Sequence, residues 1–124
     1  MIHLDTSFLI HALAEGSAQD RHLRDWIGLG EPMGMSAIGW AEFLCGPVGP
    51  TEIALARRVL GEPVAFVGDD ATLTARLFNE SGRRRGSLVD CMIAAVALRA
   101  DARLATANPS DFRRYEGAGL QLMV

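Results

Sequence analysis

Residues 87–112 read SLVDCMIAAVALRADARLATANPSDF, and this stretch decides the fold class. Ser87–Ala100 carries apolar residues at helical spacing, and they cover a broad part of the helix surface. This pattern predicts a helix that is buried over much of its circumference. Arg103–Thr106 then predicts a short strand, and Pro109–Tyr115 predicts a further short helix. A helix that leads directly into an apolar strand is typical of α/β proteins.

The same alternation extends outward to both ends of the chain. Further helices are expected over Phe8–Ala14, Ala18–Leu29, Ala37–Cys45 and Thr51–Leu60, and one more from Asp69 and Asp70 onward. Further short apolar runs that predict strands lie at Met1–Leu4, Pro32–Met35, Val64–Val67 and Leu120–Val124. This order predicts a mostly parallel central sheet between two helical layers, a three-layer α/β/α fold that binds ligands at the carboxyl edge of its strands. A length of 124 residues fits one domain spanning 1–124.

Composition excludes several classes of function. All 12 basic residues are Arg, so enzymes that depend on a Lys amine, such as Schiff-base enzymes and P-loop proteins, are ruled out. The net charge of −3 argues against a surface that coats nucleic acid broadly. Without a signal peptide or an apolar run that could span a membrane, a cytoplasmic location is expected. Cys45 and Cys91 are expected to be reduced and packed in the core.

Four acidic side chains fall at similar points of the alternation. Asp5 follows the first strand, Glu42 lies in the helix after the second, and Asp90 and Asp111 open two later helices. In a parallel sheet these places meet at one edge, although they are far apart in the sequence. Crowded carboxylates repel one another unless a cation lies between them, so the set predicts a site for a hard cation such as Mg²⁺ or Mn²⁺.

Each acid also has a structural interpretation. Asp5, Asp90 and Asp111 could serve only as helix caps, and Ser87 together with Asp90 fits the cap of the long helix. Glu42 is harder to explain in this way because its neighbours on both sides are apolar. A carboxylate in such a segment needs solvent, a partner or a metal.

Three segments resemble the successive motifs of the PIN-domain family, especially its VapC toxins. They are MIHLDTSFLI at the start, SAIGWAEFLCG in the middle, and the stretch quoted above, in the family's order and over nearly the whole chain. The resemblance implies a metal-dependent endoribonuclease that hydrolyses RNA phosphodiester bonds. It also implies a homodimer, and a small antitoxin protein whose tail can block the acidic site.

The family's acids carry over to individual positions. Its first acid matches Asp5, its helical glutamate matches Glu42, and its third acid matches Asp90 in the VDCMIAA segment. Thr6 and Ser7 match the polar residues beside the first acid.

The fourth acid is the point at which the chain departs from the family pattern. A segment that often reads T-R-D or T-R-N, with D-F downstream, is here Thr106-Ala107-Asn108 followed by Asp111-Phe112. Either Asn108 or Asp111 could therefore be the fourth ligand, and Ala107 removes an arginine that many relatives carry. This departure also leaves open a PIN fold that has lost hydrolysis and serves as an RNA- or protein-binding module.

A basic turn precedes the helix that bears Asp90. It reads Gly82-Arg83-Arg84-Arg85-Gly86. Such a run is often only a solvated surface, but its position near the acidic edge suits contacts to RNA phosphates. Arg83, Arg84 and Arg85 are therefore candidate RNA-binding residues.

Overall fold

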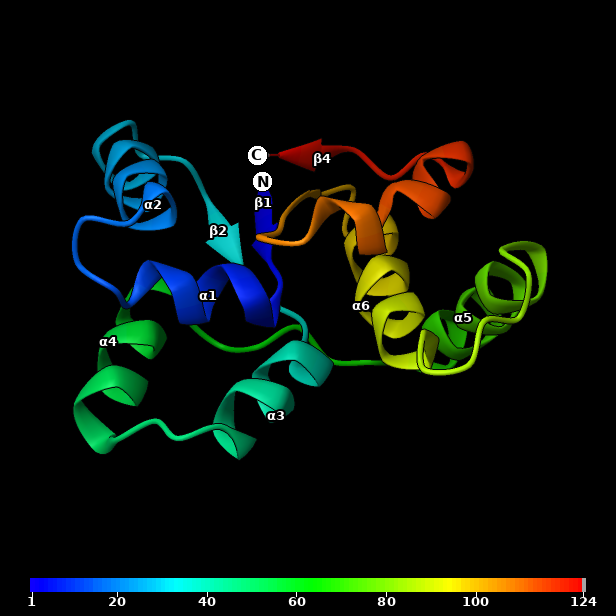
Figure 1. The fold of residues 1–124 in the computed structure, drawn as a ribbon, viewed down its shortest axis with the longest axis horizontal. Coiled ribbons are helices and arrows are strands. Elements are labelled where there is room, and N and C mark those ends of the chain that lie inside the picture. Colours follow the sequence, from blue (N-terminus) through cyan, green and yellow to red (C-terminus); the bar gives the residue numbers. More distant parts are fainter. Residues whose placement is uncertain (124) are drawn as a thin grey trace.

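A four-stranded sheet lies at the centre of the computed structural model, which describes residues 1–123 (Figure 1). Its strands are β1 (Ile2–Leu4), β2 (Met33–Gly34), β3 (Arg103–Ala105) and β4 (Leu122–Met123), in the order β2-β1-β3-β4. Every neighbouring pair is parallel. β1 therefore pairs on one side with β2 and on the other with β3, so that segments from opposite ends of the chain meet at the centre of the sheet.

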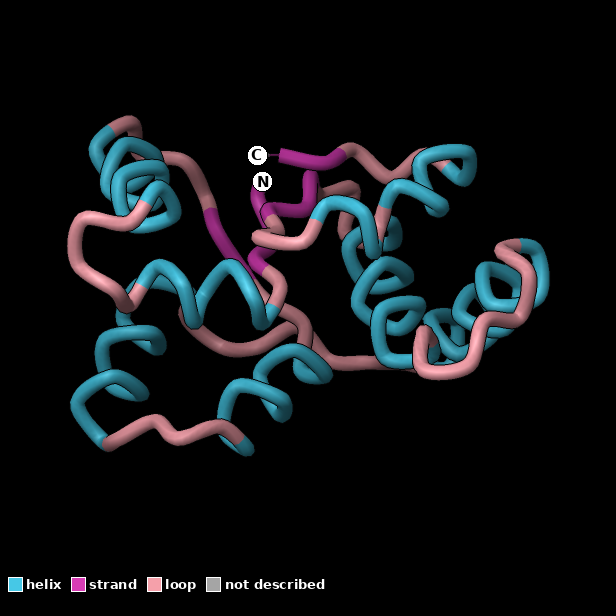
Figure 2. The backbone as a smooth tube through the Cα atoms, viewed as in Figure 1, coloured by secondary structure: helices cyan, strands magenta, loops and turns pink. Residues whose placement is uncertain are grey.

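Helices cover both sides of this sheet. They are α1 (Thr6–Ala12), α2 (Ala18–Gly28), α3 (Ala37–Cys45), α4 (Pro50–Leu60), α5 (Gly68–Glu80) and α6 (Leu88–Arg99), with 3-10 turns η1 (Pro109–Asp111) and η2 (Arg113–Ala118). Figure 2 shows the strands between a group formed by α1 to α4 and a group formed by α5 and α6. The predicted three-layer α/β/α fold is confirmed. Within residues 1–123, none of the helices combines the length and apolarity that a membrane crossing requires.

The core has one apolar cluster on each side of the sheet. In the first, Phe8 of α1 stacks on Trp26 of α2 with ring centroids 5.4 Å apart. In the second, α6 contributes Ala94 and Ala97, both fully buried, and packs against Tyr115. A helix that is apolar over most of its circumference must be surrounded by protein, which explains why the α6 sequence predicted the architecture so well.

Some expected elements differ from the structure. Val64–Val67 is not a strand: Val64 forms a single parallel bridge with Ser36, and the following residues leave the sheet. Pro109–Tyr115 is not one helix but two 3-10 turns, η1 and η2, on either side of Phe112. The closing strand is limited to Leu122–Met123, and Val124, which was expected to extend it, lies outside the described residues.

Two predictions about individual side chains were also wrong. Cys45 is exposed at the end of α3 rather than packed in the core, whereas Cys91 is buried as expected. Ser87 stands at the N-cap of α6, but its side chain does not cap the helix. Its hydroxyl instead donates to the carbonyl of Arg84 at 2.7 Å and thereby closes the preceding basic turn.

Candidate metal-dependent active site

The four predicted acids come from four separate segments and face a common region. Asp5 follows β1, Glu42 lies in α3, Asp90 lies in the first turn of α6, and Asp111 ends η1. The backbone N–H of Asp5 donates to the carbonyl of Ala105 at 3.0 Å, which brings the ends of β1 and β3 together. The region therefore lies at the carboxyl edge of the parallel sheet, where α/β proteins bind ligands.

Asp5 is both a helix cap and a buried carboxylate, with 4% of its surface exposed. One oxygen accepts from the backbone N–H of Phe8 at 2.8 Å and caps α1. The other accepts from the hydroxyl of Thr106 at 2.6 Å, and the Ser7 hydroxyl lies 2.8 and 3.0 Å from the two oxygens. Burial raises the pKa of Asp5, while these hydrogen bonds oppose that rise because they favour the charged form. The capping role and the site role are thus filled by the same side chain.

Glu42 is exposed, so the apolar neighbours in its sequence do not bury it. Only one face of α3 packs inward, with Phe43 and Gly39 buried and Leu44 left 45% exposed. Glu42 Oε1 accepts from the hydroxyl of Thr6 at 2.8 Å. Thr6 therefore orients the Glu42 carboxylate, as Ser7 orients that of Asp5.

Asp90 is the carboxylate most strongly affected by the others. Its pKa rises to about 6, first because the side chain is partly buried and then because Asp111, Glu42 and Asp5 lie nearby, while Arg114 opposes the rise. Like charges raise the pKa of a carboxyl group because they make its ionised form less favourable. Asp90 is thus within electrostatic reach of the three other acids.

The two candidates for the fourth position differ in their placement. Asp111 shares with Asp90 the lining of a polar pocket of about 160 Å³. Asn108 is exposed and is not among the residues that line this pocket, and its backbone N–H donates to Thr106 Oγ1 at 3.0 Å. The Asn108 side chain makes no capping hydrogen bond to η1. Asp111 is therefore better placed beside Asp90 than Asn108 is.

Two further side chains, Thr106 and Arg114, belong to this region and were not among the predicted site residues. Thr106 is 3% exposed and binds Asp5 directly, and Arg114 lines the pocket beside Asp90 and Asp111. For Thr106 a signal was available, since a hydroxyl residue directly after a strand lies at the same sheet edge as Asp5. Arg114 gave none, because the helix expected across it is interrupted at Phe112.

The three candidate RNA-binding arginines do not act as one patch. The guanidinium of Arg83 donates to Asn79 Oδ1 and lies over the ring of Phe78, 5.4 Å from its centroid, so it turns toward α5. Arg84 and Arg85 instead line the pocket that contains Asp90 and Asp111. Only two of the three thus face the acidic region.

The donor set suits a hard divalent cation. Carboxylate oxygens from Asp5, Glu42, Asp90 and Asp111, with the neutral amide oxygen of Asn108 close in sequence, are the ligand type that Mg²⁺ and Mn²⁺ prefer. Within residues 1–123, no three such side chains are already drawn together at metal-ligand distances.

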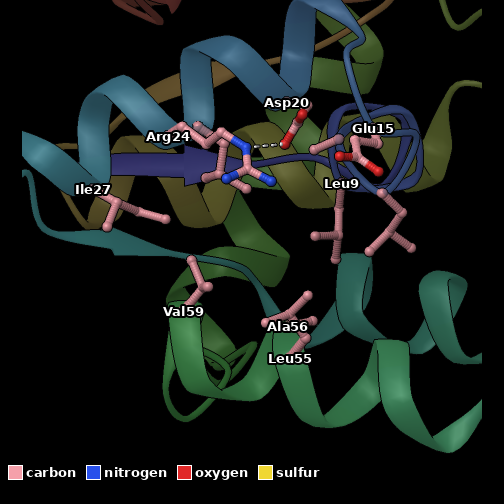
Figure 3. Close-up of a pocket in the computed structure, with 11 residues that line it drawn as sticks. Leu9, Glu15, Asp20, Arg24, Ile27, Leu55, Ala56 and Val59 are labelled. Carbon is pink, nitrogen blue, oxygen red and sulfur yellow. Dashed lines mark hydrogen bonds and ion pairs between the residues drawn. The ribbon is translucent and has the colours of Figure 1, made fainter.

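An apolar groove lies in a different region of the molecule. It has a volume of about 440 Å³ and lies between α1, α2 and α4 (Figure 3). Leu9, Ile27, Leu55 and Val59 point into it, and the ion pair between Asp20 and Arg24, 2.9 Å long, lies along its rim. Leu55 and Ile27 remain 52% and 49% exposed, so residues 1–123 leave apolar surface uncovered in this groove.

Comparisons with known proteins agree with this architecture. The family model for the PIN domain matches residues 2–118. VapBC2 from Rickettsia felis, bound to a DNA fragment from its promoter, is 19% identical with a TM-score of 0.76, over 99% of this chain and 98% of that chain. A toxin-antitoxin complex from Klebsiella pneumoniae is 22% identical with a TM-score of 0.76, over 100% and 97%. VapBC-5 from Mycobacterium tuberculosis is 27% identical with a TM-score of 0.62, over 98% and 95%. No curated protein sequence matches the chain significantly.

Proposed function

The chain belongs to the PIN domain family, and from this premise we propose that it is a metal-dependent endoribonuclease of the VapC type, the toxin of a toxin–antitoxin pair. The observation that carries the proposal is the convergence of four carboxylates at the carboxyl edge of the sheet. Asp5, Glu42, Asp90 and Asp111 come from four segments, and Asp90 is affected electrostatically by the other three. A structural role alone gives no reason to gather four mutually repelling charges.

Asp5, Glu42, Asp90 and Asp111 would hold Mg²⁺ or Mn²⁺, with Asn108 as a possible neutral donor. The bound ion would lower the pKa of an attacking water and neutralise charge on the phosphate and the leaving oxygen. The chain itself provides the positioning. Thr106 and Ser7 donate hydrogen bonds to the buried carboxylate of Asp5, which favour its charged form against the effect of burial, and Thr6 fixes the direction of Glu42.

The test is cleavage of RNA by the purified protein with Mn²⁺ or Mg²⁺ and with a chelator. We expect cleavage only with the cation, and none from Asp5→Asn or Asp90→Asn, because each change removes a charged ligand and keeps the shape of the side chain. Variants purified in parallel control for contaminating ribonucleases. Wild-type cleavage by either variant contradicts the assigned roles. Binding of RNA and metal without cleavage supports the non-catalytic binding module instead.

The proposed protein partner is the cognate antitoxin, as in the complexes to which this fold is similar. The apolar groove between α1, α2 and α4 suits the apolar face of an antitoxin helix, because Leu55 and Ile27 expose much of their surface there. Leu55→Asp should abolish co-purification with the antitoxin and leave RNA cleavage intact. Leu29→Asp, at a side chain that is 77% exposed and lies outside the groove lining, is the matched control. Equal losses in both variants contradict this placement.

We also propose a homodimer, as the family resemblance implies. Leu88 and Val89, in the first turn of α6, are 46% and 36% exposed and offer apolar surface for a second copy. Light scattering on the purified chain measures its mass directly. A monomer over the working concentration range contradicts the dimer.

A further inference from the structure

The pocket beside Asp90 holds opposite charges at close range. It has a volume of about 160 Å³ and is lined by Arg84, Arg85, Gly86, Ser87, Asp90, Asp111 and Arg114. The carboxylates belong to the proposed metal site. The three arginines have no place in metal binding, since a guanidinium cannot donate a lone pair to a cation.

The guanidinium groups of these arginines are not paired with acceptors among the described residues. In the part of the chain that the structure describes, Arg84, Arg85 and Arg114 form no salt bridge and no side-chain hydrogen bond. Elsewhere this chain neutralises a buried acid by direct contact, as Arg99 does with Asp70 at 2.7 Å. Arg114 thus lacks the contact that a purely structural counter-ion makes.

The backbone conformation of the turn before α6 directs its arginine side chains to different places. Gly82 and Gly86 have φ of 94° and 87°, and Arg83 itself lies in the left-handed region at φ 55°. The backbone N–H and the hydroxyl of Ser87 both lie within hydrogen-bond distance of the Arg84 carbonyl, at 3.2 and 2.7 Å. This closed turn sends Arg83 toward α5 and leaves Arg84 and Arg85 at the pocket.

A negatively charged strand that approaches four carboxylates is repelled unless cations lie along its path. Guanidinium groups bind the non-bridging oxygens of a phosphodiester with paired, charge-assisted hydrogen bonds. We infer that Arg114, together with Arg84 and Arg85, forms a subsite for an RNA phosphate next to the one that is cleaved. The inference rests on the proposed ribonuclease function. It adds Arg114 as a positioning residue and leaves Arg83 outside the subsite.

The experiment compares Arg114→Ala with Arg113→Ala, because Arg113 is the adjacent, exposed arginine and does not line the pocket. Binding of a labelled single-stranded RNA is measured on the inactive Asp5→Asn background over a range of salt concentrations. Arg114→Ala should weaken binding about tenfold and reduce the log–log salt slope by roughly 0.7 to 1, the value of one lost phosphate contact. Arg113→Ala should match its parent.

Kinetics on the active chain give a second readout. Arg114→Ala should raise KM about tenfold and change kcat less, because it removes binding to a phosphate that does not react. Adding Arg84→Ala and Arg85→Ala should enlarge the effect, whereas Arg83→Ala should not.

The outcomes separate the two proposals. If Arg114→Ala behaves like Arg113→Ala while the wild type cleaves RNA, the subsite is wrong and the ribonuclease stands. If the wild type does not cleave but Arg114-dependent, salt-dependent RNA binding is present, the ribonuclease is wrong and the three arginines are a phosphate-binding site of an RNA-binding module instead. If Asp5→Asn binds no RNA, or if Arg114→Ala lowers only the Tm of the chelated protein, the subsite is overturned.

Discussion

The two halves of the acidic site are held in different ways. Asp5 and Glu42 are oriented by hydroxyl groups, with Thr106 and Ser7 on the first and Thr6 on the second. Asp90 and Asp111 make no side-chain hydrogen bond within residues 1–123 and instead share a pocket with arginines. In the hydroxyl-bonded half, hydrogen bonds fix the directions of Asp5 and Glu42. In the arginine-facing half, the like charges of the other acids act on Asp90, so under the proposed function this half gains most from a cation.

The largest expected effect concerns the hydroxyl-bonded half. Thr106→Val removes the 2.6 Å hydrogen bond to Asp5 and the acceptor for the Asn108 N–H, with little change in shape. Cleavage should fall about 10- to 100-fold, as for other side chains that support a metal ligand. The free energy of unfolding should fall by about 1 to 3 kcal/mol, because the buried carboxylate of Asp5 loses a hydrogen-bond donor.

Thr74→Val is the matched control for that change. Thr74 is 4% exposed, and its hydroxyl has no hydrogen-bond partner among the described residues. Replacing it should leave cleavage unchanged and leave stability equal or higher, since an unsatisfied buried hydroxyl is lost. Denaturant unfolding and a cleavage assay on both variants make the comparison. A Thr106→Val protein that is destabilised but cleaves normally would reduce Thr106 to a purely structural role.

The next effect concerns the fourth ligand in the arginine-facing half. If Asp111 supplies charge to the cation, Asp111→Asn should weaken Mn²⁺ binding about tenfold or more, equivalent to about 1.4 kcal/mol. Asn108→Asp should be tolerated or should tighten binding, because it adds a charge near the site. Isothermal titration of Mn²⁺ into both variants measures the difference. Unchanged affinity in Asp111→Asn would transfer the role to Asn108 or leave three ligands.

Local sequence signals predicted much of the hydroxyl-bonded half. Asp5-Thr6-Ser7 follows an apolar strand and starts a helix; Asp5 indeed caps α1, and the Ser7 hydroxyl donates to its carboxylate. α6 was predictable for the same kind of reason, because its apolar circumference needs protein on most sides. The cap at Asp5 depends on contacts between residues that are close in the sequence. The burial of α6 follows from one periodic pattern of apolar residues.

The remainder depends on which distant segments meet, and a local pattern can at most place a residue such as Thr106 at the edge of the sheet. Thr106 reaches Asp5 across a sequence separation of 101 residues, and only the pairing of β1 with β3 brings them together. Arg114 follows the break at Phe112 between two 3-10 turns, so the face of a continuous helix misplaces it. The exposure of Glu42 likewise depends on which face of α3 packs against α1 and α6. These facts come from tertiary structure.

The smallest expected effect tests the repulsion in the arginine-facing half through pH. The pKa of Asp90 is raised to about 6 from 3.8, so the folded protein binds this proton more tightly than the unfolded chain does. That contribution to stability is complete below about pH 3.8 and is lost as the pH rises through 6. Asp90→Asn removes the titration. In the presence of a chelator, Asp90→Asn should therefore be more stable than the wild type at pH 8, by on the order of 1 kcal/mol after allowance for partial solvent screening. This advantage should shrink toward pH 4.5.

Saturating Mn²⁺ should reverse the order of stability at pH 8, because only the wild type gains the binding energy of the charged ligand. Urea unfolding at both pH values, with chelator and with Mn²⁺, measures all four differences. A chelated Asp90→Asn protein whose stability relative to the wild type does not change with pH would show that Asp90 is not strained by its neighbours, and the contrast between the two halves of the site would fail.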